Sequence, residues 1–294
     1  MLEHLSTERR NEKTMHLDKM TTHEILNTMN AEDQIVAISV AKEIQNIENL
    51  VKSVITSFKQ GGRLIYIGAG TSGRLGILDA VECPPTFGTD KEMVQGLIAG
   101  GLEAFTVAVE GAEDSETLAA DDLKNISLDE KDTVIGIAAS GRTPYVIGGL
   151  QYAKSVGANT GSIACNKHAE ISKYAEVSVE VETGAEILTG STRLKAGTAQ
   201  KLVLNMISTA SMIGIGKVYK NLMVDVQSTN IKLVERSKRI IMEATGADYK
   251  TAEEHYEQAN RNVKAAIVMI LLQCTYEEAV KKLEDADGFV RHTL

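Results

Sequence analysis

Two short segments of this chain combine glycine, hydroxyl and arginine residues in an order that suits a bound phosphate group. Residues 68–74 read Gly-Ala-Gly-Thr-Ser-Gly-Arg, and residues 138–144 read Ala-Ala-Ser-Gly-Arg-Thr-Pro. The first N–H groups of a helix point outward with partial positive charge, and glycine lets a ligand approach the backbone closely. We expect both segments to bind one phosphorylated small molecule. The candidate contacts are Thr71, Ser72, Gly73, Arg74, Ser140, Gly141, Arg142 and Thr143.

Two carboxylates, Glu82 and Glu113, are the candidates for proton transfer. Glu82 follows the helix expected after the first segment and precedes Pro84 and Pro85, which should end that helix. Glu113 lies in a glycine-containing acidic turn at residues 109–114. A carboxyl group near a phosphate and partly shielded from water is harder to ionise, so one could act as an acid and the other as a base. The alternative from composition is that Glu82 merely ends a helix and Glu113 is a solvated turn residue.

The elements that would position these residues alternate between short β-branched runs and helical stretches. Five strands are predicted, at residues 64–67, 94–99, 133–137, 160–164 and 177–181. The alternation predicts an α/β three-layer sandwich, in which a mainly parallel open sheet is covered by helices on both faces. Ligands of such sheets bind beyond the carboxyl ends of the strands, which is where both segments fall.

Helical patterns flank the expected sheet and suggest three parts of the chain. Residues 1–53 should form a polar, irregular arm and the start of one long amphipathic helix, whose apolar positions run from Val36 to Phe58. Residues 54–225 should form the domain that holds the sheet and the phosphate-binding segments. Residues 226–294 show four successive helical stretches and should form a small helical domain. The last of these stretches begins with a capping box made by Thr275 and Glu278.

Composition limits the possible partners. The net charge of −9 disfavours nucleic acid or an acidic membrane as the main partner. The start of the chain has no apolar signal core, and the longest apolar run, residues 265–272, is too short to cross a bilayer. Three widely spaced cysteines fit reduced thiols in a cytoplasmic protein. No histidine, cysteine or carboxylate group has metal-ligand spacing, so no metal is expected.

The glycines of the first segment raise the question of whether it binds a nucleotide. Gly68, Gly70 and Gly73 match the dinucleotide pattern GxGxxG, but that site also needs an unbroken helix and an acid at the end of the second strand. Here two prolines interrupt the expected helix, and Asp90 precedes the second strand. Neither segment ends in the Gly-Lys-Ser/Thr of a P-loop. Redox-coenzyme and kinase chemistry are therefore disfavoured.

A longer string carries a specific resemblance. Residues 70–88 read Gly-Thr-Ser-Gly-Arg-Leu-Gly-Ile-Leu-Asp-Ala-Val-Glu-Cys-Pro-Pro-Thr-Phe-Gly, which is similar to the N-acetylmuramic acid 6-phosphate etherase family of SIS (sugar isomerase) domain proteins. Three further segments support the resemblance, at residues 7–11, 109–114 and 190–198. The match extends from residue 7 to about residue 225, and the helical tail resembles the small UBA-like C-terminal domain of that family.

The resemblance implies a cofactor-free lyase that removes D-lactate from N-acetylmuramate 6-phosphate, and a homodimer with its site near the subunit boundary. By analogy with the family, Glu82 would protonate the departing lactate and Glu113 would remove the C2 proton. Ser191, in the hydroxyl-rich segment at residues 189–198, would add a substrate contact. Two alternatives stay open: a non-catalytic sugar-phosphate-binding regulatory protein, and an aldose–ketose isomerase of sugar phosphates.

Overall fold

Five parallel strands form the main sheet of the computed structural model, which describes residues 5–107, 109, 111–226 and 230–294. The sheet order is β2-β1-β3-β4-β5, and every neighbouring pair is parallel. The strands are β1 (Leu64–Gly68), β2 (Val94–Ile98), β3 (Thr133–Ala138), β4 (Asn159–Ala164) and β5 (Val177–Glu180). All five strands predicted from the sequence are confirmed.

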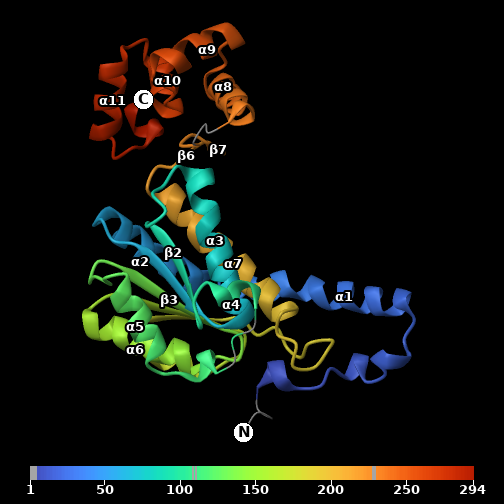
Figure 1. Cartoon of the computed structure of the whole chain (residues 1–294). Helices are drawn as coiled ribbons and strands as arrows, with labels where there is room; N and C mark the ends of the chain where they lie inside the picture. The colour runs from blue at the N-terminus through green and yellow to red at the C-terminus, as the bar shows by residue number, and fades with distance from the viewer. Residues whose placement is uncertain (1–4, 108, 110, 227–229) are drawn as a thin grey trace. The chain divides into compact units, whose positions relative to one another are not determined.

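Helices α5 (Leu118–Asn125) and α6 (Pro144–Val156) cover one face of this sheet (Figure 1). Alternate strand residues, including Ile65 and Ile67 of β1, point to this face and pack among the buried residues of both helices. The core on this side is therefore built from the odd-numbered positions of β1.

Helices α2 (Ile44–Lys59), α3 (Gly70–Phe87) and α7 (Lys195–Gly214) supply the cover for the opposite face. Tyr66 of β1 points to this face, and its hydroxyl donates to the Asp79 carboxylate of α3 at 3.0 Å. Asp79 also accepts from Asn205 and Ser208 of α7, at 2.7 and 3.1 Å. Burial raises the pKa of Asp79 despite these three hydrogen bonds. The expected three-layer α/β sandwich is confirmed.

The strand order changes direction at β1, because β2 lies on one side of it and β3 on the other. Strand β1 pairs with β2 on one side and with β3 on the other, with Gly68 opposite Ile137 in the second pair. A crevice opens beyond the carboxyl ends of two strands where successive connections leave in opposite directions. The loops that follow β1 and β3 start at this point, so the two phosphate-binding segments predicted from the sequence are neighbours.

The single long helix predicted up to Phe58 is wrong, because two helices, α1 (Thr22–Ala41) and α2, take its place. Glu43, between them, has non-helical angles of φ −104° and ψ 6°. Its carboxylate is 5% exposed and pairs with Lys167, which lies beyond β4. A tertiary ion pair thus holds Glu43 out of the helix, which periodicity alone does not reveal. Before α1, the expected irregular arm contains three short 3-10 helices, η1 (Ser6–Glu8), η2 (Glu12–Thr14) and η3 (Leu17–Lys19).

The expected end of α3 before Pro84 is also wrong, since the helix continues through Pro84 and Pro85 to Phe87. Proline has no N–H to donate, so two intrahelical hydrogen bonds are lost. Both prolines lie in the last turn, where Gly88 N–H donates to the Pro84 carbonyl at 2.9 Å and closes the helix. Glu82 consequently lies within a helix, and the alternative that it marks a helix end does not hold.

Backbone contacts divide the chain into two compact units, residues 1–80 with 92–208 and residues 81–91 with 209–294. The second unit contains a short antiparallel pair and four helices around their own apolar core, with Ile241, Tyr256 and Ile267 fully buried. Its elements are β6 (Val218–Tyr219), β7 (Leu222–Met223), α8 (Ile231–Thr245), α9 (Tyr249–Gln258), α10 (Val263–Leu272), α11 (Tyr276–Asp285) and η6 (Val290–Thr293). The predicted capping box of Thr275 and Glu278 begins α11. In the described part of the chain, no helix has the length and apolar character needed to cross a membrane.

Candidate active site

A pocket of about 210 Å³ lies where β1 and β2 end and α3 begins. Its wall combines small apolar residues with one cation, Arg74, and one carboxylate, Glu113. The lining residues are Ala69, Gly70, Arg74, Ala99, Ala104, Val109, Gly111 and Glu113. Glu113 reaches the pocket from η4 (Ala112–Asp114), a single 3-10 turn that follows Gly111 with φ +75°. One of the two candidate carboxylates therefore lies in one pocket with Gly70 and Arg74 of the first predicted segment; its neighbour Glu110 is outside the described residues.

The first turn of α3 supplies the hydrogen-bond donors beside this pocket. Gly73 N–H donates to the Ala69 carbonyl at 3.2 Å, whereas the N–H groups of Gly70, Thr71 and Ser72 precede the first helical acceptor. We call these three N–H groups the anion cradle. Gly73 must be glycine, because a Cβ there would be 2.6 Å from Cγ1 of Ile98. The close approach of α3 to β2 thus fixes the cradle at the sheet edge.

Arg74 is held against the pocket wall by the backbone of the next helix. Its Nε donates to the Phe105 carbonyl and its Nη2 to the Ala104 carbonyl, both at 2.8 Å. Both carbonyls belong to α4 (Glu103–Thr106). A guanidinium is always charged and can donate through five N–H groups. Arg74 therefore adds a fixed positive charge next to the cradle.

The second predicted segment lies beyond the neighbouring strand β3. Gly141 has φ +75°, and a Cβ there would be 2.4 Å from Cβ of Ala169, so only glycine fits. Ser140 and Thr143 flank it, and Arg142 is exposed. None of the four lines the 210 Å³ pocket, and neither do Thr71, Ser72 and Gly73. The structure places the two segments at adjacent strand ends, with the pocket on the β2 side of the cradle.

The N-terminal arm is tied to the second segment through Asn166, which follows β4. Asn166 Nδ2 donates to the Ala139 carbonyl at 3.1 Å and to Thr7 Oγ1 at 2.9 Å. Asn166 Oδ1 accepts from Ser6 Oγ at 2.9 Å and from Thr7 N–H at 3.3 Å. Thr7 is fully buried as a result. The arm residues that carry the family resemblance therefore lie beside Ser140.

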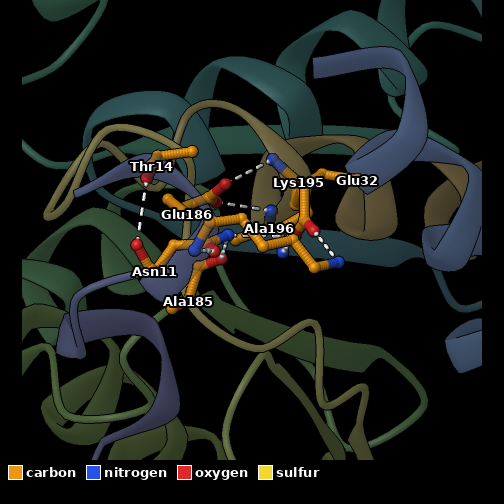
Figure 2. Close-up of polar contacts among 8 residues, drawn as sticks. Asn11, Thr14, Glu32, Ala185, Glu186, Lys195 and Ala196 are labelled. Atoms are coloured by element: carbon orange, nitrogen blue, oxygen red, sulfur yellow. Dashed lines mark hydrogen bonds and ion pairs between the residues drawn. The ribbon is translucent and has the colours of Figure 1, made fainter. Parts of the chain in front are cut away.

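The loop containing Ser191 leads into α7, whose first turn lies against that of α3. An added Cβ at Gly197 would be 3.4 Å from Cγ2 of Thr71. Glu186 accepts from the N–H groups of Lys195 and Ala196 at 3.0 and 2.9 Å (Figure 2). Burial raises the pKa of Glu186, against the opposing effect of these N–H groups. A protein carboxylate thus occupies the anion position of α7, and the cradle of α3 stays available.

A buried ion pair fixes the start of α7. Lys195 Nζ donates to Glu32 Oε2 at 2.6 Å, and the two side chains are 2% and 6% exposed. Glu32 also accepts from Lys13 at 2.8 Å and from Asn11 Nδ2 at 3.1 Å, so the arm joins the same network (Figure 2). Burial opposes ionisation of Glu32, but the hydrogen bonds and charges of Lys13 and Lys195 outweigh it and lower its pKa.

Replacing Lys195 by methionine should lower the free energy of unfolding by about 3 kcal/mol, because the Glu32 carboxylate would lose its buried cation and keep only the largely exposed Lys13 as a charged partner. Urea denaturation followed by circular dichroism measures this change. Lys52→Met is the matched control, since its partner Glu48 is half exposed and the expected cost is below about 0.5 kcal/mol. Equal effects of the two substitutions would contradict the assigned role of the buried pair.

Glu82 lies on α3, twelve residues after Gly70. A helix rises about 1.5 Å per residue, so its Cα is about 18 Å along the axis from the cradle. Glu82 is exposed, as is Glu113. Glu113 lines the pocket, whereas Glu82 is not among its lining residues.

Comparison with known proteins identifies the family. Proteins named N-acetylmuramic acid 6-phosphate etherase from Bacillus cereus (strain G9842) and Bacillus anthracis (strain A0248) are each 77% identical to this chain over all 294 residues, the full length of both partners. The chain belongs to the N-acetylmuramic acid 6-phosphate etherase family. This membership confirms the resemblance carried by residues 70–88.

Domain and fold comparisons agree with membership in the etherase family. Models of the "Glucokinase regulatory protein N-terminal SIS domain" and of the "SIS domain" match residues 46–154 and 103–210. The solved structure of a phosphoheptose isomerase from Francisella tularensis is 11% identical, with a TM-score of 0.50, and covers 66% of this chain and 100% of its own. That likeness shows a shared fold.

Several residues of this etherase-family site were not found from the sequence. Asn166 lies two residues after the strand predicted at residues 160–164, and the rule that ligands bind at carboxyl strand ends could have singled it out. Glu186 and Glu32 meet Lys195 only through tertiary contacts, and no local pattern marks them. Among the described residues, no cluster of three or more histidine, cysteine or acidic side chains could hold a metal ion.

Proposed function

We propose that this chain cleaves the D-lactyl ether of N-acetylmuramate 6-phosphate with water, giving N-acetylglucosamine 6-phosphate and D-lactate. The observation that carries the proposal is Glu113 in one pocket with Arg74 and the start of the anion cradle, in a chain 77% identical to etherases over its full length. The cradle would hold the 6-phosphate through N–H groups at a helix N-terminus. Ser140, Thr143 and Ser191 would contribute further hydroxyl contacts.

The chemistry needs one base and one acid. In the open-chain sugar, the C1 aldehyde acidifies the proton on C2. A carboxylate takes that proton, the electron pair forms the C2–C3 double bond, and the C3–O bond breaks as the departing lactate oxygen receives a proton from the acid. Water then adds at C3 of the unsaturated aldehyde, and C2 is protonated again. Every proton is returned, so the two carboxyl groups end in their starting states.

We infer that Glu113 is the base at C2 and that Glu82 is the acid at the lactate oxygen. Placement supports the first assignment, because Glu113 lines the pocket beside the cradle. The roughly 18 Å between the first turn of α3 and Glu82 makes a within-chain contribution of Glu82 to that pocket implausible. We therefore propose a homodimer in which Glu82 of the partner subunit completes each site.

Exposed apolar side chains on α1 support a second copy of the chain as the partner. Leu26, Ile35 and Ile38 are 60%, 41% and 63% exposed, and no residue from 21 to 31 is buried. An amphipathic helix in a soluble monomer would bury such residues or replace them with polar ones. We also infer a cytoplasmic location, which the three free cysteines support.

One assay separates the proposed reaction from its alternatives. The purified protein is incubated with N-acetylmuramate 6-phosphate, and D-lactate is measured with a coupled dehydrogenase. An etherase releases lactate in amounts equal to the substrate consumed. A regulatory protein would bind the sugar phosphate without consuming it, and an aldose–ketose isomerase would change the sugar without releasing lactate. Absence of lactate would overturn the proposal.

A further inference from the structure

Ser72 of the first segment is joined to a buried glutamine that lies far along the chain. Its Oγ donates to Oε1 of Gln200 at 3.0 Å. Ser72 is 7% exposed in the first turn of α3, and Gln200 is 1% exposed in the second turn of α7. The hydrogen bond therefore spans the contact between the starts of these two helices.

The other end of the Gln200 amide has no partner. Its Nε2 is buried and makes no hydrogen bond to any described residue. Most buried donors in native proteins are paired, and an unpaired one is costly. The unpaired Nε2 donor therefore needs an explanation. Ser72 is the residue to consider, because its hydroxyl already contacts the Gln200 amide.

Helix α7 can influence a bound anion only through side chains. Its first two N–H groups are bound by Glu186, and those of Gly197 and Thr198 donate to the carbonyls of Thr192 and Leu194 at 3.0 and 2.9 Å. The start of α7 nevertheless lies within contact distance of Thr71. Gln200 connects α7 to the first turn of α3 through its hydrogen bond with Ser72.

A serine hydroxyl has one proton and two acceptor sites. This proton is directed to Gln200, and while it is, Ser72 cannot donate it to a phosphate. A half-turn of the Gln200 amide exchanges Oε1 and Nε2. Nε2 would then donate to Ser72 Oγ, Oε1 would move to the position that has no partner, and the hydroxyl proton would be free to turn toward the cradle.

We propose that Gln200 is a positioning residue that sets the direction of the Ser72 hydroxyl proton, so that Ser72 donates to the substrate phosphate while Gln200 Nε2 donates to Ser72 Oγ. The identity of the sugar phosphate rests on the proposed function; the coupling between the two side chains does not. The affinity for phosphate would then depend on a side chain that does not touch the phosphate.

Binding of N-acetylglucosamine 6-phosphate, measured by titration calorimetry, tests the proposal without turnover. Ser72→Ala and Gln200→Leu should each weaken binding about tenfold, the effect of one hydrogen bond to a charged group. The double variant should also lose about tenfold, because both changes remove the same bond. A loss near a hundredfold in the double variant would show that the residues act independently and would overturn the proposal.

Gln200→Glu distinguishes proton direction from simple anchoring. The carboxylate keeps the acceptor for Ser72, removes the donor and adds a negative charge near the phosphate, so at pH 8 this variant should bind at least tenfold more weakly than wild type. Wild-type affinity in Gln200→Glu would mean that Gln200 only holds Ser72 in place. Failure of the wild-type protein to bind the sugar phosphate would also overturn the proposal.

Asn205→Ala is the control on the same helix. Asn205 donates to the Asp79 carboxylate on the sheet side, so its loss should lower the melting temperature and leave sugar-phosphate affinity unchanged. The lactate assay on wild-type protein is run in parallel. Coupling between Ser72 and Gln200 without lactate release would refute the proposed reaction while the inference about Gln200 stands.

Discussion

Replacing Glu113 by glutamine should lower the rate of lactate release about a thousandfold, the usual contribution of a positioned general base. Glutamine has nearly the same shape and fills the same part of the pocket wall, but its amide cannot accept the C2 proton. The fold and the affinity for N-acetylglucosamine 6-phosphate should change little, because the phosphate is held by the cradle. Coupled lactate detection and calorimetry measure the two effects separately.

Asp114→Asn is the matched control for this substitution. Asp114 is the next residue of the same 3-10 turn, is exposed, and is not part of the pocket lining. It removes the same charge from the same turn, so any effect due only to the local field should appear in both variants. Near-wild-type lactate release in Glu113→Gln, or an equal loss in Asp114→Asn, would rule out Glu113 as the base.

Glu82→Gln should lower lactate release by a similar factor of about a thousand, because the departing oxygen would lose its proton donor. Its effect on C2 should differ, since Glu113 is intact. In heavy water we expect Glu82→Gln to exchange the C2 proton of the substrate for deuterium, and Glu113→Gln to leave it in place. Nuclear magnetic resonance of the recovered sugar phosphate measures this exchange.

Glu130→Gln provides the comparison for Glu82→Gln. Glu130 is an exposed glutamate on the turn before β3, at the amino end of the sheet and so opposite the pocket edge. Its replacement should leave turnover unchanged. Exchange at C2 in Glu113→Gln but not in Glu82→Gln would reverse the two roles.

The sheet and its ligand-binding edge were predictable because their signals are local. Each strand is a short run that contains β-branched residues, and Gly73 and Gly141 mark places where a Cβ would collide with a neighbouring element. Strand-then-helix order implies parallel pairing, and parallel pairing brings the two segments to one edge. These steps need no knowledge of side-chain contacts.

The errors arose where tertiary contacts outweighed local preference. The pair of Glu43 with Lys167 breaks the long N-terminal helix, and α3 continues through Pro84, where local preference would end it. Sequence pattern cannot show either outcome, because each depends on what the segment packs against. Glu82 and the cradle consequently lie on one continuous helix, twelve residues apart.

The same reason explains why Gln200 and Glu186 were not found. Gln200 lies 128 residues from Ser72 along the chain, and Glu186 binds the start of α7 from outside that helix. A buried glutamine and a buried glutamate have no periodicity of their own. Only the folded arrangement reveals that one leaves a donor unpaired and that the other occupies a helix N-terminus.

The central claim is that each site takes Glu113 from one subunit and Glu82 from the other. Glu82→Gln and Glu113→Gln chains with different affinity tags are co-expressed, and heterodimers are isolated by two successive affinity steps. Each heterodimer then has one site with both native glutamates and one with neither. We predict about half of the wild-type lactate release per dimer, since one of two equivalent sites is restored. Activity no higher than that of either single variant would contradict the claim.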